Sequence, residues 1–412
     1  EAVRLVEHKQ VARMRRGPGG GLVVMPPSLD SVADAVSVYL LYVRAEIDDV
    51  FEARLALEEA AAELAPDRLD ESHIAALRSL VRREAEGTVT DHRTFHGLVA
   101  EATGNPALEF FVDLLNRVTL MYLPRGATLT RSTLAESAAA HAAILDAVLA
   151  GDESRARRRM RKHLQAEAEY LRVRRPSRRR LAELSDAVDR SDKRAEATAR
   201  RIFAEITAAG WPVGELLGSE AELMARYDVS RAVLREAVRV LEHHQVAHMR
   251  RGPGGGLLVA EPGVGATTDA VAIHVDRRGI EARQLFEVRG AVEMAVLDRV
   301  MTGLDEAGVA RLRAALDAER AATPDEFPVV GHDLHNELAS VGGNRVLELL
   351  TLVLTRLTRL RTRALPATPD PLPTHQVSAV HGGIVDAVVA GDAELARHRM
   401  RRHLDALVDW VG

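Results

Sequence analysis

Apolar residues recur three or four positions apart along most of the chain, which is the spacing that lines one face of an α-helix. The pattern is clearest in five segments, residues 50–64, 107–123, 137–170, 283–300 and 345–360. The period-two alternation that is typical of strands is scarce. The chain is therefore predicted to fold as a mainly α-helical protein.

One short stretch departs from the helical pattern. Residues 246–249 (VAHM) and 257–259 (LLV) flank the glycine-rich segment RRGPGGG at 250–256. Two short apolar segments joined by a glycine-rich turn are typical of a β-hairpin. We expect a small hairpin here, set among helices.

The chain also repeats itself. Residues 236–259, EAVRVLEHHQVAHMRRGPGGGLLV, reappear almost unchanged at 1–24 as EAVRLVEHKQVARMRRGPGGGLVV, an offset of 236 − 1 = 235 residues. Matched positions continue downstream, where Arg54 in the first copy corresponds to Arg289 in the second, and His96 corresponds to His335. A repeat of this length predicts two copies of one module related by a pseudo-twofold axis, which suits a target that also repeats.

Before the hairpin of the second copy, the sequence predicts two helices separated by a tight turn. Glu220–Tyr227 has amphipathic spacing, Asp228 and Val229 form the turn, and Ser230 offers an N-cap hydroxyl to Arg231–His243. This is the pattern of a helix-turn-helix, whose second helix enters the major groove of DNA. The hairpin would then be a wing, which favours this interpretation over an ordinary helical pair. The glycines lack the spacing of a dinucleotide-binding or P-loop motif.

These motifs together resemble a known family. LGSE at 217–220, DVSR at 228–231, LREA at 234–237 and RGPGGG at 251–256 are similar to the DNA-binding domain of GntR-family bacterial transcription regulators. The downstream helices resemble the FCD effector domain of its FadR-like subgroup. The resemblance covers nearly the whole chain, twice. It implies a winged helix-turn-helix domain followed by an all-α helical-bundle effector domain, duplicated in tandem.

The resemblance and the repeat together divide the chain into five expected parts. The first copy starts at the residue that matches Glu236, so its winged helix-turn-helix is expected to be truncated and unable to dock on DNA by itself. The expected parts are a truncated winged helix-turn-helix at 1–28, an FCD-like domain at 29–171, a linker at 172–192, a winged helix-turn-helix at 193–263 and an FCD-like domain at 264–412.

The recognition helix is expected to read DNA through its first turns. Arg231 can reach guanine or phosphate, and Arg235 lies one turn later on the same face. The expected DNA-contacting residues are Ser230, Arg231, Arg235, Arg250, Arg251 and Gly254 in the second copy, and Arg15 and Arg16 in the first. Two departures from the family pattern are present. Ala221 stands where an arginine is common, which concerns specificity, and Asp228 replaces a glycine in the turn, where aspartate tolerates a left-handed backbone.

Histidines form the second candidate constellation. His141 and His163 are 163 − 141 = 22 residues apart, His381 and His403 are 403 − 381 = 22 apart, and His96 and His335 lie on earlier helices. Three imidazoles without cysteine suit zinc or a similar divalent ion and leave a position for water or an anion. Single histidines on helices are ordinarily structural, but three at matched spacing favour a metal.

The FCD resemblance implies the same metal site with one further ligand, an aspartate one helical turn before the first histidine. Neither copy has it. In the first copy His92 occupies that position and is expected to act as a ligand, whereas in the second copy the position is Gly331, with His332 nearby. We therefore expect a divalent metal, with zinc as first candidate, in the first copy ahead of the second. The expected ligands are His92, His96, His141, His163, His335, His381 and His403.

Arg54 and Arg289 are candidates for binding the carboxylate of an effector, a role that the resemblance supports. The alternative is a structural ion pair with Glu58 or Glu293, four residues later on the same helical face. The sequence leaves both interpretations open.

Composition narrows the function classes. A formal net charge of −5 argues against a protein that coats nucleic acid indiscriminately. The absence of cysteine excludes disulfides and thiolate metal sites, and it fits a reducing cytoplasm. No uninterrupted apolar run is long enough to span a bilayer. A cytoplasmic protein is expected.

The combined expectation is a ligand-responsive transcription repressor without enzymatic activity. Its tandem halves would form a pseudo-dimer on a double-stranded DNA operator with two half-sites, controlled by a small carboxylate-type metabolite in the effector domain. Two alternatives stay open at this point. One is a metabolite- or metal-sensing scaffold whose DNA binding has decayed, as Ala221 suggests. The other is a metal-dependent hydrolytic enzyme, although no general base is placed beside the histidines.

Overall fold

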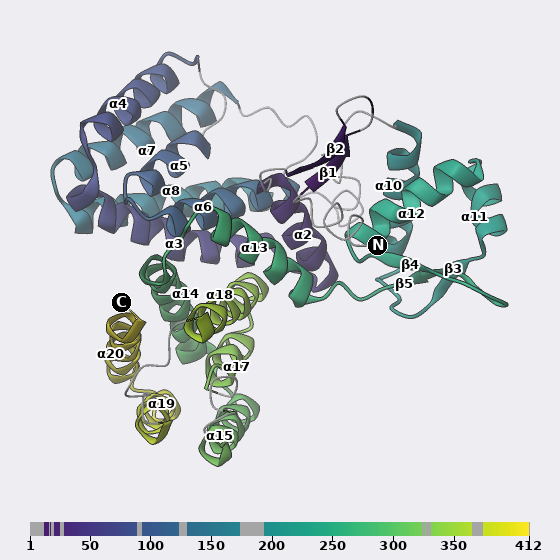
Figure 1. Cartoon of the computed structure of the whole chain (residues 1–412). Helices are drawn as coiled ribbons and strands as arrows, with labels where there is room; N and C mark the ends of the chain where they lie inside the picture. Colours follow the sequence, from purple (N-terminus) through teal and green to yellow (C-terminus); the bar gives the residue numbers. More distant parts are fainter. Residues whose placement is uncertain are drawn as a thin grey trace. The chain divides into compact units, whose positions relative to one another are not determined.

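The computed structural model describes residues 12–15, 17, 20–24, 29–88, 93–122, 130–173, 193–323, 326, 331–364 and 374–411. Helices predominate among them, which confirms the predicted fold class (Figure 1). None of the described helices is long and apolar enough to cross a membrane. Packing divides the chain into two compact units. Unit 1 comprises Glu1–Ala45, Arg117–Ala127 and Leu171–Arg277, and unit 2 comprises Glu46–Asn116, Thr128–Tyr170 and Arg278–Gly412.

Unit 1 contains a winged helix-turn-helix. Its elements are α10 (Lys193–Ala208), β3 (Leu216–Gly218), α11 (Glu220–Tyr227), α12 (Arg231–His243), β4 (Ala247–Arg250) and β5 (Gly256–Val259). The helices α11 and α12 have the predicted bounds, and β4 and β5 form the predicted hairpin, pairing from Ala247 with Val259 to Arg250 with Gly256. The third strand, β3, joins the sheet beside β5 and was not predicted, because three residues are too few to show alternation.

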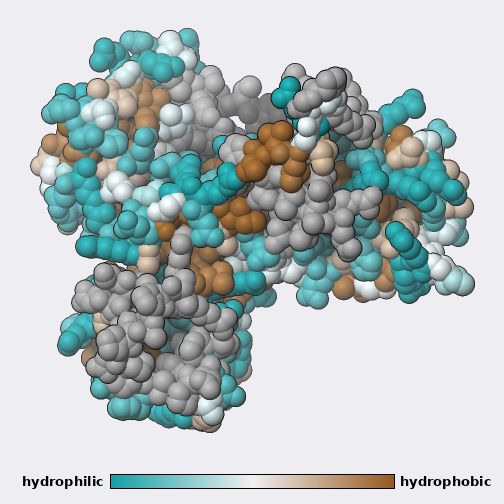
Figure 2. Space-filling view, viewed as in Figure 1, coloured by the Kyte–Doolittle hydropathy of each residue, from teal (hydrophilic) through white to brown (hydrophobic). Residues whose placement is uncertain are grey.

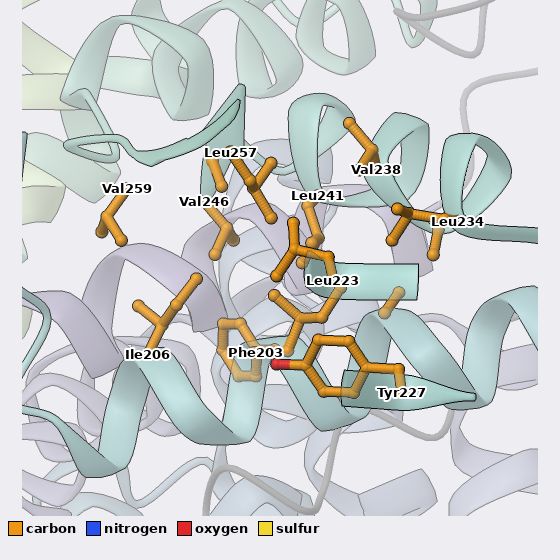
Figure 3. Packing of buried hydrophobic residues seen from close by; sticks show 14 of the residues in the cluster. Phe203, Ile206, Leu223, Tyr227, Leu234, Val238, Leu241, Val246, Leu257 and Val259 are labelled. Atoms are coloured by element: carbon orange, nitrogen blue, oxygen red, sulfur yellow. The ribbon is translucent and has the colours of Figure 1, made fainter. Parts of the chain in front are cut away.

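Apolar side chains from all three helices and the wing form one core (Figure 3). Figure 3 shows Phe203 and Leu223 near its centre, with Leu234 from the recognition helix and Leu257 from the wing around them. Leu223, Leu234 and Leu257 are fully buried. Burying a side chain of this size contributes roughly 1.5–3 kcal/mol, so the core fixes the wing against the recognition helix.

Gly256 permits β3 to approach β5 closely. A Cβ atom at this position would lie 2.3 Å from the carbonyl oxygen of Gly218. Backbone atoms cannot be displaced cheaply, so only glycine allows the two strands to pair here.

The first copy contributes a matching hairpin, β1 (Ala12–Arg15) and β2 (Gly21–Val24), with the same register as β4 and β5. Its apolar residues have a different environment. Val24 is 63% exposed, whereas its counterpart Val259 is 2% exposed. The difference arises because Val259 packs in the core beneath the second copy's helices.

Two equivalent helices of the copies, α2 (Leu29–Tyr42) and α13 (Val264–Arg277), pack against each other within unit 1. The hydroxyl of Tyr42, at the end of α2, donates a hydrogen bond of 3.0 Å to Glu261, just before α13. Each of these helices therefore packs against its equivalent from the other copy.

In the part of unit 2 that the structure describes, the helices form two sets of six. The first set is α3 (Ile47–Arg68), α4 (Glu71–Ala85), α5 (Arg93–Glu101), α6 (Pro106–Thr119), α7 (Arg131–Leu149) and α8 (Glu153–Val173). The second set is α14 (Ala282–Gly303), α15 (Glu306–Ala321), α17 (Asp333–Gly342), α18 (Arg345–Ala364), α19 (Thr374–Val389) and α20 (Ala393–Val411). A short 3₁₀ helix, η1 (Leu120–Tyr122), follows α6. Hydrophilic residues cover most of the outer face around α4 (Figure 2). Helix α4 itself buries Leu77, Leu80 and Glu84 and leaves its other side chains at least partly exposed.

Two predicted boundaries change. Residues 137–170 form two helices instead of one, because Gly151 has a left-handed φ of 69° and Asp152 caps α8 by accepting a hydrogen bond from the Arg155 amide at 2.8 Å. Helix α8 also continues to Val173, into the predicted linker. The rest of that linker, 174–192, lies outside the described residues.

The two helix sets contact each other through equivalent elements, since α3 packs against α14. The amide nitrogen of Asn105 donates to the Gln284 carbonyl at 3.0 Å and to Glu287 at 2.9 Å. The matching amide of Asn344 donates to the Asp49 carbonyl at 3.2 Å and to Glu52 at 2.7 Å. Each copy thus makes the same contact with the other.

Candidate metal centres and nucleic-acid interface

Three helices of each set bring three histidines together. In the first set, His96 comes from α5, His141 from α7 and His163 from α8, and all three are buried. The Nε2 atom of His163 lies 3.2 Å from that of His141 and 3.4 Å from that of His96. The 22-residue spacing therefore places the imidazoles of α7 and α8 side by side.

The second set repeats this geometry. Nε2 of His403 lies 3.2 Å from Nε2 of His381 and 3.3 Å from Nε2 of His335. These three histidines are also buried, on α17, α19 and α20. Among the described residues, the two triads are the groups whose ligand atoms lie close enough to hold a metal ion.

Carboxylates orient two imidazoles in each triad through Nδ1. His141 pairs with Glu84 at 2.9 Å, and His96 contacts Glu58. The second copy has the same arrangement, with His381 and His335 each 2.7 Å from a carboxylate, Glu319 and Glu293 respectively. A carboxylate on Nδ1 leaves Nε2 as the coordinating atom and fixes the ring.

These residues fit a divalent metal. Two nitrogens bound to a tetrahedral zinc ion at about 2.05 Å lie about 3.3 Å apart, which is the separation measured between the Nε2 atoms. Three imidazole nitrogens, two of them on rings that carboxylates orient, form the donor set of a site with an open position. The structure thus brings together six of the seven predicted ligands, and that they bind metal stays a proposal.

The seventh predicted ligand, His92, lies outside the described residues. In the second copy, His332 lies at the N-cap of α17, outside the triad. Burial lowers the pKa of His332 well below its ordinary value, and the charge of Arg289 lowers it further. The charge of Arg289 acts on His335 of the triad in the same direction.

Arg54 and Arg289 each form an ion pair with the glutamate four residues later, which is the structural alternative to effector binding that the sequence left open. Nε of Arg54 donates to Glu58 at 2.7 Å, and Nε of Arg289 donates to Glu293 at 2.5 Å, with all four side chains buried. Burial raises the pKa of Glu58, but Arg54 and His96 outweigh it and hold that pKa at about 2. This pairing uses Nε. Among the described residues the Nη atoms of Arg289 have no hydrogen-bond partner, whereas Nη1 of Arg54 donates to Glu167.

The turn and caps of the helix-turn-helix follow from local chemistry. Asp228 has φ 52° and ψ 57°, the left-handed conformation expected for it at the end of α11. Ser219 and Glu222 form a reciprocal capping box at the start of α11. The Ser230 hydroxyl accepts a hydrogen bond of 3.4 Å from the Val233 amide, so it caps α12 in the free protein.

The two arginines of the recognition helix are exposed and share one carboxylate. The side chain of Arg231 is 66% exposed and that of Arg235 is 63% exposed. The Nε atoms of Arg231 and Arg235 lie 3.5 Å and 3.1 Å from Oε1 of Glu220. A shallow concavity beside them is lined by Ala221 and Ser230, among others. The predicted contact residues thus lie together on one accessible face.

The predicted wing residues are arranged differently. Nη2 of Arg250 donates to the carbonyl of Gly254 at 2.6 Å, which braces the tip of the wing, and Arg251 is exposed. In the first copy, Arg15 is exposed on β1, whereas Arg16 lies outside the described residues.

Several carboxylates at the candidate sites were not anticipated from the sequence. Glu220 faces the recognition arginines, and Glu84 and Glu319 orient His141 and His381. The repeat contained a signal for the last two, since 319 − 84 = 235 is the offset of the duplication. Matched acidic residues in matched helices would have marked them as candidates.

Comparison with known proteins gives consistent matches in both halves. The FCD domain model matches residues 49–166 and 284–406, and the model of bacterial regulatory proteins of the gntR family matches residues 194–266. The two FCD matches together cover more than half of the chain.

Two relatives cover about half of the chain each. An HTH-type transcriptional regulator in an unstable DNA locus of Streptomyces ambofaciens is 30% identical over 194 residues, 46% of this chain and 74% of that protein. The HTH-type transcriptional repressor NanR of Cronobacter sakazakii is 27% identical over 220 residues, 50% of this chain and 78% of that protein.

Among solved structures, Streptococcus agalactiae GntR matches with a TM-score of 0.44 and 22% identity, covering 52% of this chain and 99% of that one. The family matches, the winged helix-turn-helix and the repeated helix sets agree. This chain belongs to the GntR family of DNA-binding bacterial transcription regulators and carries two FCD domains.

Proposed function

We propose that the chain is a metabolite-responsive repressor in which the two FCD domains form an intramolecular pseudo-dimer. A small anion with a carboxylate group would bind beside the histidine triad and alter DNA binding by the winged helix-turn-helix. The domain divisions given above belong to the same proposal.

The observation that carries the pseudo-dimer is the reciprocal contact of Asn105 and Asn344. A twofold interface is isologous, so each residue's contact is repeated by its counterpart. Asn105 donates to Glu287 and Asn344 donates to Glu52, and 287 − 52 = 235 is the repeat offset. The packing of α2 against α13 adds a second like-with-like pairing.

The residues at the triad explain how an anion would be recognised. His96, His141 and His163, or their counterparts in the second copy, would hold the metal through Nε2. A bound divalent ion supplies positive charge and an open coordination position for an anion. The buried arginine beside the second triad, Arg289, offers Nη donors suited to a carboxylate, whereas Nη1 of Arg54 donates to Glu167.

Control of DNA binding follows if the anion has different affinities for two arrangements of the regulator. The ligand then shifts the population toward the arrangement that it prefers. By linkage, operator DNA shifts the ligand affinity by the same factor. Repression is favoured as the direction because the relative NanR is a transcriptional repressor.

The test begins with selection of duplexes from a random library by the chain itself. Fluorescence anisotropy then compares an enriched duplex with a scrambled one, with zinc and with a panel of carboxylates. We expect a specific complex that weakens on Arg231→Ala and is altered at least severalfold by one carboxylate. Specific binding that ignores the whole panel would refute control by an anion. Equal binding to both duplexes would instead favour a scaffold with decayed DNA recognition.

A further inference from the structure

The two effector sites differ at one buried guanidinium. In the first copy, Nη1 of Arg54 donates to Oε1 of Glu167 on α8 at 3.1 Å. In the second copy, neither Nη1 nor Nη2 of Arg289 has a hydrogen-bond partner among the residues that the structure describes. Both arginine side chains are almost completely buried, at 2% and 1% exposure.

A single residue difference accounts for this. Glu167 follows His163 by four residues on α8, so both lie on one helical face. Adding the local offset, 403 − 163 = 240, places its counterpart at 167 + 240 = 407, which is Leu407 on α20. A leucine offers no hydrogen-bond acceptor, so the second copy lacks the carboxylate that the first copy supplies from its own chain.

The charge balance of the two sites differs accordingly. Arg54, Glu58 and Glu167 sum to +1 − 1 − 1 = −1, whereas Arg289 and Glu293 sum to +1 − 1 = 0. The carboxylates Glu84 and Glu319 are present in both copies and cancel in the comparison. Counted over these groups, the second site is one unit more positive than the first, with or without a metal.

Buried donors without acceptors are costly, at roughly 1–3 kcal/mol for each unsatisfied group. The guanidinium of Arg289 is held in place by Glu293 through Nε and lies 5.8 Å from the ring centre of Phe286. Its Nη atoms are thus fixed and remain available to a bidentate acceptor. A carboxylate supplies two oxygens in the geometry that a guanidinium prefers.

We infer that the chain has one anion site, not two: Arg289 binds the carboxylate effector in the second copy, and Glu167 occupies the equivalent position in the first. The inference rests on the proposed effector function and specifies its stoichiometry. The first copy is held permanently in a ligand-bound-like state by its own side chain, so only the second copy responds.

The test exchanges the two residues and uses trifluoroacetate as the probe, because it is a carboxylate observable by ¹⁹F NMR. We expect the unmodified chain to bind one equivalent. Leu407→Glu closes the site and weakens binding at least tenfold, while Glu167→Leu opens the first copy and gives two equivalents. Each variant installs the residue that the other copy already has at the matched position.

Leu407→Gln and Glu167→Gln are the matched neutral controls. Leu407→Gln offers Arg289 an uncharged acceptor, so we expect it to weaken binding less than Leu407→Glu does. If both Leu407 variants kept the affinity of the unmodified chain, the assignment to Arg289 would be refuted. Two equal sites in the unmodified chain, or none, would also overturn it. The measurement contains no DNA, so its outcome is separable from the proposed function. One site at Arg289 with DNA binding indifferent to carboxylates would leave the asymmetry standing and refute only effector control.

Discussion

Glu220 restrains the recognition helix of the free protein. Its Oε1 atom lies 3.1 Å from Nε of Arg235 and 3.5 Å from Nε of Arg231. Both arginines are the proposed DNA contacts, so the carboxylate competes with DNA for the same two cations. We predict that Glu220→Gln strengthens DNA binding, which is the opposite of what most changes at a binding surface do.

The magnitude follows from the exposure of the pairs. Exposed ion pairs contribute about 0.2–1 kcal/mol each, so releasing two arginines recovers about 0.4–2 kcal/mol. At about 1.4 kcal/mol for each factor of ten, this corresponds to roughly 2- to 30-fold tighter binding. Each guanidinium freed to reach a phosphate steepens the dependence of log K on log salt by about 0.9.

The assay is fluorescence anisotropy on a selected duplex at salt concentrations from about 50 to 200 mM. Glu236→Gln is the control, because it removes the same charge from a residue on the recognition helix that pairs with Arg239 at 2.6 Å instead. Circular dichroism checks that α11 survives the loss of an acidic residue from its first turn. Equal effects of the two variants, or weaker binding by Glu220→Gln, would refute the reasoning.

Three further predictions concern metal, pH and packing. Cobalt is expected to bind at two equivalents per chain, and His141→Ala or His381→Ala should each reduce this to one equivalent. Cobalt at about 100 times its Kd should stabilise the loaded unit by about 3 kcal/mol. Unchanged stoichiometry in the variants would contradict metal binding by the triads. Burial, reinforced by Asp30, raises the pKa of Asp34 from 3.8 to about 6. The Asp34 carboxyl therefore ionises more readily in the unfolded chain than in the folded one, which destabilises the fold above pH 6. Asp34→Asn should increase the free energy of unfolding by roughly 1–3 kcal/mol at pH 7.5 and lose that advantage at pH 4, as measured by denaturant unfolding. An effect of the same size at both pH values would exclude this cause. Gly256→Ala, which forces a Cβ against the β3 backbone, should destabilise unit 1 by roughly 1–3 kcal/mol, while Gly290→Ala, with no atom within 4 Å, should not destabilise unit 2.

Local chemistry made the helix-turn-helix predictable to the residue. Ser230 caps α12 and Asp228 reverses the chain, and both effects depend on neighbours in sequence. The turn between α7 and α8 also has a local sequence signal, because Gly151 is followed by the capping residue Asp152. The helical spacing of apolar residues continues through this turn, so the spacing alone did not reveal it. Strand β3 had too few residues to alternate and exists because β5 lies beside it.

The candidate sites were predictable only in part, for the same physical reason. Spacing brought His141 and His163 together because α7 and α8 are consecutive helices. Glu84 reaches His141 from α4, 57 residues earlier, and no local pattern encodes a contact between separate helices. The donors could therefore be derived from the sequence, whereas the carboxylates that orient them required the packed structure.

The duplication makes the asymmetry of the arginines meaningful. Both copies keep the arginine, its glutamate four residues later, the three histidines and the orienting carboxylates, so they impose the same local requirements on whatever lies against the Nη atoms. Among the described residues, the matched positions 167 and 407 answer that requirement differently, with a carboxylate in the first copy and an apolar side chain in the second. Buried Nη donors without an acceptor are unfavourable unless a ligand supplies one. The first copy then acts as a fixed reference for the second, and the response of the regulator depends on the occupancy of a single site.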